Sequence, residues 1–224
     1  MIFKNKELII FDLDGTLINS IPDITLALNI MLKHYNFSSL SIEQTTTFVG
    51  NGPRPLVNRA LSCYIREDDI SENFFEEALS IFMSAYKKST CIETYLYPGV
   101  KETLTYLHER GYKLAICTNK PFEFIEPIIK KLGIKSNFTH WIGENSLPEK
   151  KPNAMPLIHL ANKNNVSIER CLMIGDSKND ILAAKSANME CIGLNYGYNY
   201  NENIEDYGPT LVLDNFSELM ELFK

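Results

Sequence analysis

The feature that most constrains the fold is an apolar run that stops at a carboxylate. Residues 8–11 read Leu-Ile-Ile-Phe, and Asp12, Leu13, Asp14 and Gly15 follow directly. A short run that is apolar at every position predicts a strand buried on both faces of a parallel sheet. Residues i and i+2 of an extended chain point the same way, so Asp12 and Asp14 are expected to face one pocket beyond the carboxyl end of that strand. Two buried like charges repel, so the pair requires a cation or a proton.

The rest of the chain mostly alternates between strand-like and helix-like segments. Further strands are expected at residues 113–117, 171–174, 191–194 and 210–213, with helices at residues 100–109, 122–132, 154–163, 178–187 and 216–223. Strands that alternate with helices indicate a parallel sheet covered by helices on both faces. The predicted fold class is therefore α/β, with a Rossmann-like core.

One long interval after the first strand breaks this alternation. It contains helical patterns at residues 23–35, 42–49, 55–63 and 72–88 and no convincing strand. An insertion of this length and character predicts a second, all-helical cap domain. We assign residues 1–18 and 96–224 to the α/β core and residues 19–95 to the cap, with hinges where the chain crosses between them.

Polar side chains also follow two later strands. Thr118 and Asn119 follow residues 113–117, where a hydroxyl and the amides of a helix start would form a phosphate cradle. Taken alone, these two residues are more typical of an ordinary helix cap. Asp176 follows residues 171–174 and Asp180 comes one helical turn later. Oxygen ligands of this kind suit Mg²⁺, although a helix N-cap also explains Asp176 alone.

A lysine pair, Lys150 and Lys151, precedes Pro152 in a predicted loop. An ammonium at this place would offset the clustered carboxylates and hold a phosphate as a point charge. Such a pair is also common in solvated loops, so by itself it does not decide between the two interpretations.

Composition limits the classes of partner. The 224 residues carry a formal net charge of -6, which argues against non-specific binding to nucleic acid or an anionic membrane. No apolar stretch is long enough to span a bilayer and no signal peptide precedes the first strand, so a cytoplasmic protein is expected. The five cysteines form no CxxC pair and suggest neither a disulfide framework nor a zinc site. These limits leave a small-molecule partner, and a monomer and a homodimer both stay open.

The order and placement of these motifs resemble those of the haloacid dehalogenase superfamily of phosphohydrolases. The matching segments are Asp12-Leu-Asp-Gly-Thr16, Thr118, Lys151 and Gly175-Asp-Ser-x-x-Asp180. The resemblance spans nearly the whole chain and includes the helical insertion after the first motif.

The resemblance implies a role for each residue. Asp12 would be the nucleophile that forms an aspartyl-phosphate, and Asp14 the general acid and then the base. Mg²⁺ would be held by the Asp12 carboxylate, the Asp14 backbone carbonyl and Asp176. The resemblance assigns the remaining positions as follows: phosphate binding to Gly15, Thr118, Asn119 and Lys151, charge neutralisation to Lys151, and orientation of Lys151 or a metal-bound water to Asp180. Thr16 favours a hydrolase, because phosphomutases of this superfamily commonly carry Val or Ile there.

The expected substrate depends on a second resemblance, in the cap. Residues 48–57 resemble the specificity segment of bacterial phosphoglycolate phosphatases, above all at Val49-Gly50-Asn51-Gly52. Glycines at a helix start expose N–H groups suited to an anion, and Arg54 would pair with a substrate carboxylate. A solvated surface arginine is an equally good interpretation of Arg54.

The resemblance thus implies a phosphoric monoester hydrolase that converts 2-phosphoglycolate to glycolate and phosphate. A pyrophosphatase, a sugar-phosphate or nucleotide phosphatase, and a phosphomutase of the same superfamily remain alternatives.

Overall fold

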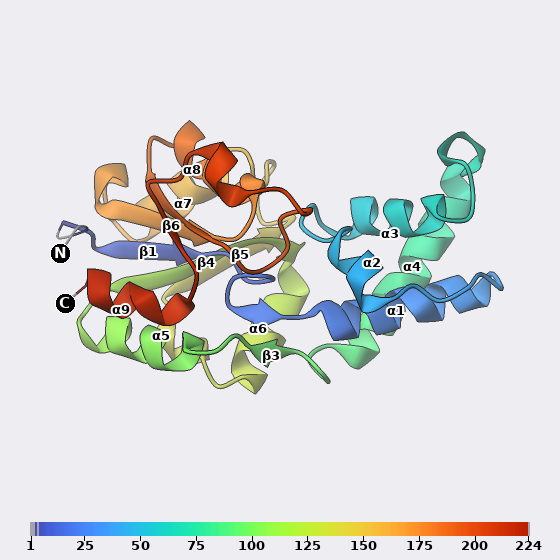
Figure 1. Ribbon diagram of the computed structural model, residues 1–224, viewed down its shortest axis with the longest axis horizontal. Helices are drawn as coiled ribbons and strands as arrows, with labels where there is room; N and C mark the ends of the chain where they lie inside the picture. Colours follow the sequence, from blue (N-terminus) through green and yellow to red (C-terminus); the bar gives the residue numbers. More distant parts are fainter. Residues whose placement is uncertain (1–2, 4, 224) are drawn as a thin grey trace.

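The computed structural model describes residues 3 and 5–223, and its largest element is a six-stranded parallel sheet in the order β5-β4-β1-β6-β7-β8. The strands are β1 (Leu8–Phe11), β4 (Lys113–Pro121), β5 (His140–Glu144), β6 (Cys171–Gly175), β7 (Glu190–Leu194) and β8 (Leu211–Leu213). The first strand lies near the middle of the sheet, between β4 and β6. The predicted α/β fold class is therefore confirmed (Figure 1).

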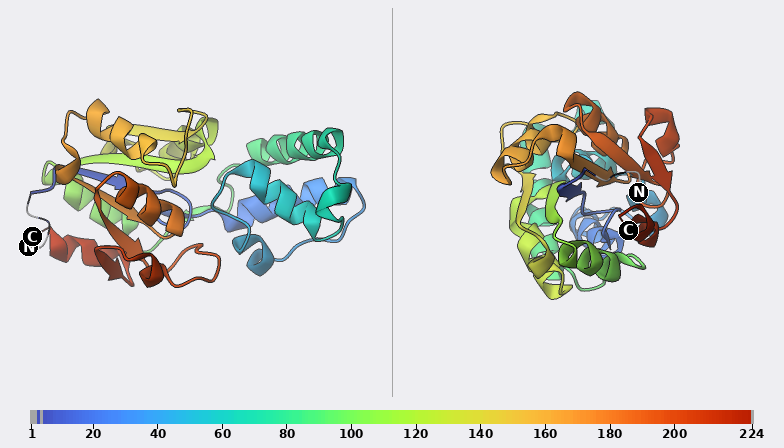
Figure 2. Two further views of the ribbon diagram at one scale, coloured as in Figure 1. Left: turned by 90° about the horizontal axis from the view of Figure 1, so that it is seen from above. Right: turned by 90° about the vertical axis from the view of Figure 1, so that its left-hand side faces the viewer.

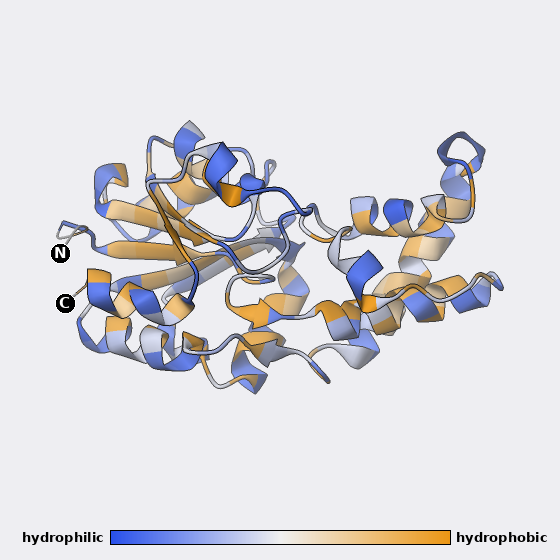
Figure 3. Cartoon of the chain, in the orientation of Figure 1, coloured by the Kyte–Doolittle hydropathy of each residue, from blue (hydrophilic) through white to orange (hydrophobic). Residues whose placement is uncertain are grey.

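Alternate residues of β1 serve two separate apolar cores, as a strand buried on both faces requires. Ile9 and Phe11 belong to the core on one face, whereas Leu8 and Ile10 belong to the core on the other. The first face is covered by α5 (Val100–Glu109), α6 (Phe122–Lys131) and α9 (Leu219–Leu222), and the second by α7 (Met155–Lys163) and α8 (Lys178–Ser186). Figure 3 shows the resulting concentration of apolar residues in the strands.

The inserted interval forms four helices at one end of the molecule (Figure 2). They are α1 (Ile21–His34), α2 (Ile42–Thr46), α3 (Pro53–Ser62) and α4 (Glu72–Ser89). The chain leaves and re-enters the sheet region through β2 (Ile18–Asn19) and β3 (Tyr95–Leu96), which pair antiparallel. We call residues 19–95 the cap; the domain boundaries themselves stay a prediction.

Short 3₁₀ helices complete the described chain: η1 (Glu67–Asp69), η2 (Lys135–Asn137), η3 (Ile168–Arg170), η4 (Ile204–Tyr207) and η5 (Phe216–Glu218). Among the described residues, no helix combines the length and apolar character needed to cross a bilayer.

Three local expectations were wrong. The edge strand β5 was not predicted, because His140 and Gly143 interrupt its apolar pattern. The pair β2 and β3 was missed because two-residue strands carry too little pattern to detect. The third concerns β4, which continues to Pro121 instead of ending at residue 117, with a register shift against β5.

Candidate active site

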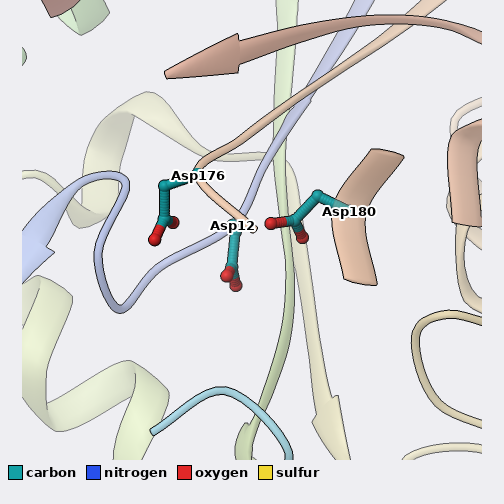
Figure 4. A group of neighbouring side chains, drawn as sticks. All are labelled: Asp12, Asp176 and Asp180. Carbon is teal, nitrogen blue, oxygen red and sulfur yellow. The ribbon is translucent and has the colours of Figure 1, made fainter. Parts of the chain in front are cut away.

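Three buried carboxylates meet where β1 and β6 end. These neighbouring parallel strands pair Phe11 with Ile174, so Asp12 and Asp176, which follow shortly after, emerge at the same edge. Asp180 reaches the same point from the first turn of α8. One ligand oxygen from each of the three lies within 4.8 Å of the others. Figure 4 shows the three side chains as neighbours. The tertiary structure therefore brings the two predicted carboxylate ligands, Asp12 and Asp176, together with Asp180, while the predicted ligation by the Asp14 backbone carbonyl stays a prediction.

The acid cluster formed by Asp12, Asp176 and Asp180 is electrostatically unfavourable by itself. Burial, together with the charges of Asp12 and Asp180, raises the pKa of Asp176 well above its usual value. Burial also raises the pKa of Asp12, to about 7, although the neighbouring Lys151 opposes that shift. Like charges in a low-dielectric site favour protonation or a bound cation.

The donor set fits a divalent cation that prefers oxygen ligands. All three side chains are buried carboxylates, and Asp12 Oδ1 pairs with the ammonium of Lys151. One ammonium does not balance three carboxylates, and a bound cation would offset the remaining negative charge.

Lys151 supplies one positive charge to the cluster. Its Nζ lies 2.9 Å from Asp12 Oδ1 and 2.5 Å from Asp180 Oδ1. Burial disfavours the ammonium, but the charges of Asp12 and Asp180 outweigh it and raise the pKa of Lys151. Asp180 is held from its other side as well, because its Oδ2 accepts hydrogen bonds from the backbone N–H and the hydroxyl of Ser177. The lysine is thus fixed between two carboxylates whose positions are set by the fold.

Asp14 lies outside the acid cluster, although it lines the same cavity as Asp12. Its carboxylate accepts hydrogen bonds from the Ser20 hydroxyl and from Lys120 Nζ, whose distances to Oδ1 and Oδ2 are 2.9 and 3.2 Å. As the sequence predicts, β1 ends at Phe11 and both aspartates line one cavity beyond it, but Asp12 contacts Lys151 whereas Asp14 contacts Ser20 and Lys120. The two carboxylates consequently have different partners.

The turn after Asp14 wraps around Asp176. Gly15 has a φ of +91°, and a Cβ at this position would collide with the Asp176 carboxylate, so only glycine fits without strain. The Thr16 hydroxyl donates to Asp176 Oδ1 over 2.6 Å, and the backbone N–H of Tyr198 donates to Oδ2 over 2.7 Å. The carboxylate is therefore oriented from two segments that lie far apart in the sequence.

Thr118 and Asn119 are buried and line the cavity between core and cap. Asn119 Nδ2 donates to the carbonyl oxygens of Lys151 and Gly50, each over 3.0 Å, while its Oδ1 has no hydrogen-bond partner among the described residues. Helix α6 begins at Phe122, as predicted, and the phosphate-binding role of Thr118 and the amides of this helix start stays a prediction.

The glycine-rich loop of the cap packs directly on the core. The Gly50 carbonyl accepts from both Asn119 and Asn179, and the Asn51 carbonyl accepts from Lys150 Nζ over 2.8 Å. Gly50 and Gly52 line the cavity with the catalytic candidates. These contacts describe a cap that is closed over the site.

Arg54 does not reach this cavity. Its guanidinium is half-exposed, pairs with Glu72 and Glu76 of α4 and lies over the ring of Phe75. The structure therefore corrects the expected substrate contact of Arg54 and matches the surface interpretation instead, because two acidic neighbours already satisfy the guanidinium.

Sequence reasoning missed several residues at the site. Lys120 was assigned no role, although it stands at a strand end beside two predicted site residues. Residues 195–203 were assigned no role. In the structure, the Tyr198 backbone N–H donates to Asp176, and the Tyr200 hydroxyl donates to Asn51 Oδ1 over 2.7 Å. The density of tyrosines in that segment was the available signal.

Comparison with known proteins decides the family. A model of the haloacid dehalogenase-like hydrolases matches residues 9–194. The chain belongs to the haloacid dehalogenase-like hydrolase family.

Individual relatives agree with this assignment. The chain is 47% identical over 221 residues, and 98% of both chains, to a protein named phosphoglycolate phosphatase from Colwellia psychrerythraea. It is 42% identical to a protein of the same name from Vibrio parahaemolyticus, over 98% of this chain and 96% of the relative. The crystal structure of a predicted phosphoglycolate phosphatase from Haemophilus somnus superposes with a TM-score of 0.93 at 39% identity, covering 98% of each chain. As a member of this family, the protein is an enzyme that hydrolyses phosphoric monoesters.

Proposed function

We propose that the protein is a Mg²⁺-dependent phosphatase that hydrolyses 2-phosphoglycolate to glycolate and phosphate through an aspartyl-phosphate on Asp12. The observation that carries the proposal is the acid cluster held by Lys151 at the floor of a cavity closed by the cap. The names of the relatives at 42–47% identity support the choice of substrate.

In the proposed reaction, a carboxylate oxygen of Asp12 attacks the phosphorus and the ester P–O bond breaks. Asp14 donates a proton to the leaving oxygen and afterwards takes one from the water that attacks the phosphorus of the aspartyl-phosphate. This second attack releases phosphate and restores Asp12. The separate environments of the two aspartates suit separate roles, because Asp12 contacts Lys151 whereas Asp14 contacts Ser20 and Lys120.

Lys151 offsets the negative charge of the phosphoryl group beside Asp12 as that charge redistributes in the transition state. Asp12, Asp176 and the backbone at Asp14 would hold Mg²⁺, which supplies further electrostatic stabilisation of the phosphoryl oxygens when bound. Asp180 keeps Lys151 in place. The closed cap excludes water from the site until the phosphoenzyme has formed.

A substrate panel tests the proposal. The panel contains 2-phosphoglycolate, 3-phosphoglycerate, glucose 6-phosphate, AMP and pyrophosphate. We expect the wild-type enzyme with Mg²⁺ to show its highest kcat/KM for 2-phosphoglycolate. Rapid mixing should release glycolate in a burst that is stoichiometric with enzyme and absent in Asp12→Asn. Efficient hydrolysis of another compound, with 2-phosphoglycolate hardly turned over, would defeat the choice of substrate.

A further inference from the structure

The cavity between core and cap holds a cation and a hydroxyl that the proposed chemical steps do not use. Lys120, at the end of β4, is only 6% exposed, and its Nζ contacts Asp14. Tyr86, on cap helix α4, is 3% exposed and places its ring centroid 4.8 Å from that Nζ. Both side chains line the cavity, so core and cap each contribute one polar group to the same wall.

The Tyr86 hydroxyl is buried without a hydrogen-bond partner among the described residues. Leaving such a donor unpaired is unfavourable, so its position in a ligand cavity indicates a polar acceptor on the ligand. The charge of Asp14 raises the pKa of Lys120 against the effect of burial, so the lysine stays an ammonium. An acceptor with negative charge would match both groups.

We propose that Lys120 and Tyr86 form a subsite for the carboxylate of the substrate, so that the enzyme selects small phosphorylated carboxylic acids over neutral esters. The inference rests on the proposed function, because it places the leaving group beside Asp14. A group that protonates the leaving oxygen must lie within hydrogen-bond reach of it. In 2-phosphoglycolate a single carbon separates that oxygen from the carboxylate, so the carboxylate falls next to Asp14, where Lys120 lies.

The remaining walls strengthen this selection. They are mostly apolar and include Ile24, Leu56, Phe82, Met83 and Phe124. In a low-dielectric environment an ammonium–carboxylate pair is stronger than in water. The apolar side chains of these walls offer no hydrogen bond to a neutral polar group. The free volume is about 60 Å³, room for only a few water molecules, so a two-carbon leaving group suits the closed cavity better than a sugar or a nucleoside.

A competing explanation is that Lys120 only positions Asp14. The two roles differ in their substrate dependence. A positioning residue affects every ester equally, whereas a carboxylate subsite affects only esters that carry a carboxylate. The comparison therefore uses 2-phosphoglycolate and ethyl phosphate, which share a two-carbon leaving group and differ in the carboxylate.

The experiment measures kcat/KM on both esters for the wild type, Lys120→Met, Tyr86→Phe and the control Lys163→Met, which removes an exposed lysine on α7. We expect Lys120→Met to lower the ratio of kcat/KM for 2-phosphoglycolate to kcat/KM for ethyl phosphate at least about tenfold. This is the effect of losing a charge-assisted hydrogen bond. Tyr86→Phe should lower the ratio about two- to twelvefold, mostly through KM, and Lys163→Met should leave it unchanged. Equal losses on both esters in Lys120→Met and Tyr86→Phe would overturn the subsite.

A second measurement needs no variant that must fold. Glycolate should inhibit the wild type at least about tenfold more strongly than glycolamide, which has the same shape without the charge. Equal inhibition would also overturn the subsite.

The results separate this inference from the proposed function. A wild-type enzyme that prefers another carboxylated ester would refute the choice of 2-phosphoglycolate and still support the subsite. A wild-type enzyme that prefers 2-phosphoglycolate, together with equal losses of kcat/KM on both esters in Lys120→Met, would support the choice of substrate and refute the subsite.

Discussion

Replacing Lys151 with methionine tests whether this one ammonium holds the acid cluster in the metal-free protein. Methionine keeps an unbranched apolar stem and removes only the charge and its donors. The Lys151 side chain is 1% exposed and contacts Asp12 and Asp180, neither of which has much access to water. After the substitution, two buried carboxylates lose their cation while Asp176 remains close to both.

The size of the effect follows from burial. Removing one partner of a buried ion pair costs about 3–5 kcal/mol, because the charge left behind is uncompensated. Lys150 provides a matched control one residue away. Its side chain is 40% exposed and pairs with Glu144, so Lys150→Met should cost about 1 kcal/mol or less.

The assay is chemical denaturation of the wild type, Lys151→Met and Lys150→Met at pH 8 in the presence of a chelator. We expect a loss of about 3–5 kcal/mol for Lys151→Met and its partial recovery at pH 5. The sign of the pH effect is set by Asp12, because burial raises its pKa and the loss of the Lys151 ammonium raises it further. The stability of the variant therefore falls as the pH rises. A Lys151→Met protein within about 1 kcal/mol of the wild type at pH 8 would refute the reasoning.

Three further predictions concern pH, metal and the cap. In the metal-free protein, burial raises the pKa of Asp12 to about 7, so between about pH 4 and pH 7 the folded state binds a proton that the unfolded chain has lost. The free energy of unfolding should therefore fall as the pH rises through this window, and Asp12→Asn should reduce the slope by up to about 1.4 kcal/mol per pH unit; an unchanged slope would contradict the assignment. Mg²⁺ at a hundred times its Kd should stabilise the wild type by about 2.7 kcal/mol, and Asp176→Asn should abolish this gain in a calorimetric scan, whereas an equal gain in both proteins would exclude Asp176 as a ligand. Asn179→Ala removes one of two hydrogen bonds to the Gly50 carbonyl and should raise KM about two- to twelvefold in steady-state assays through weaker cap closure; an unaltered KM would show that this contact does not hold the cap.

The core was largely predictable because its local patterns and its tertiary structure agree. Residues 8–11 form a strand with the expected bounds, and their uniform apolar character reflects burial on both faces of the sheet. The helices at residues 100–109 and 178–187 were also found within one residue, because glycine, proline and capping residues mark their ends. The edge strand β5 was missed because an edge strand needs no continuous apolar run.

The site was only partly predictable, because some contacts depend on segments that meet only in the folded chain. Asp12 and Asp176 were found because both follow buried strands, and strands that are adjacent and parallel bring their ends together. Lys120, which pairs with Asp14, lies where the register of β4 against β5 shifts, and no pattern in the sequence marks that shift. The exposed position of Arg54 likewise depends on Glu72 and Glu76, which α4 brings alongside α3.

The sequence by itself therefore determined the fold class, the edge of the sheet that carries the chemistry and the residue types gathered there, because strand periodicity and strand ends are local properties. Only the tertiary structure decided which charges pair. In the folded chain, Lys151 pairs with Asp12 and Asp180, Lys120 pairs with Asp14, and Tyr86 of the cap lines the same cavity. Electrostatic partnership depends on separations of a few ångströms between groups far apart along the chain, and those separations are set by packing.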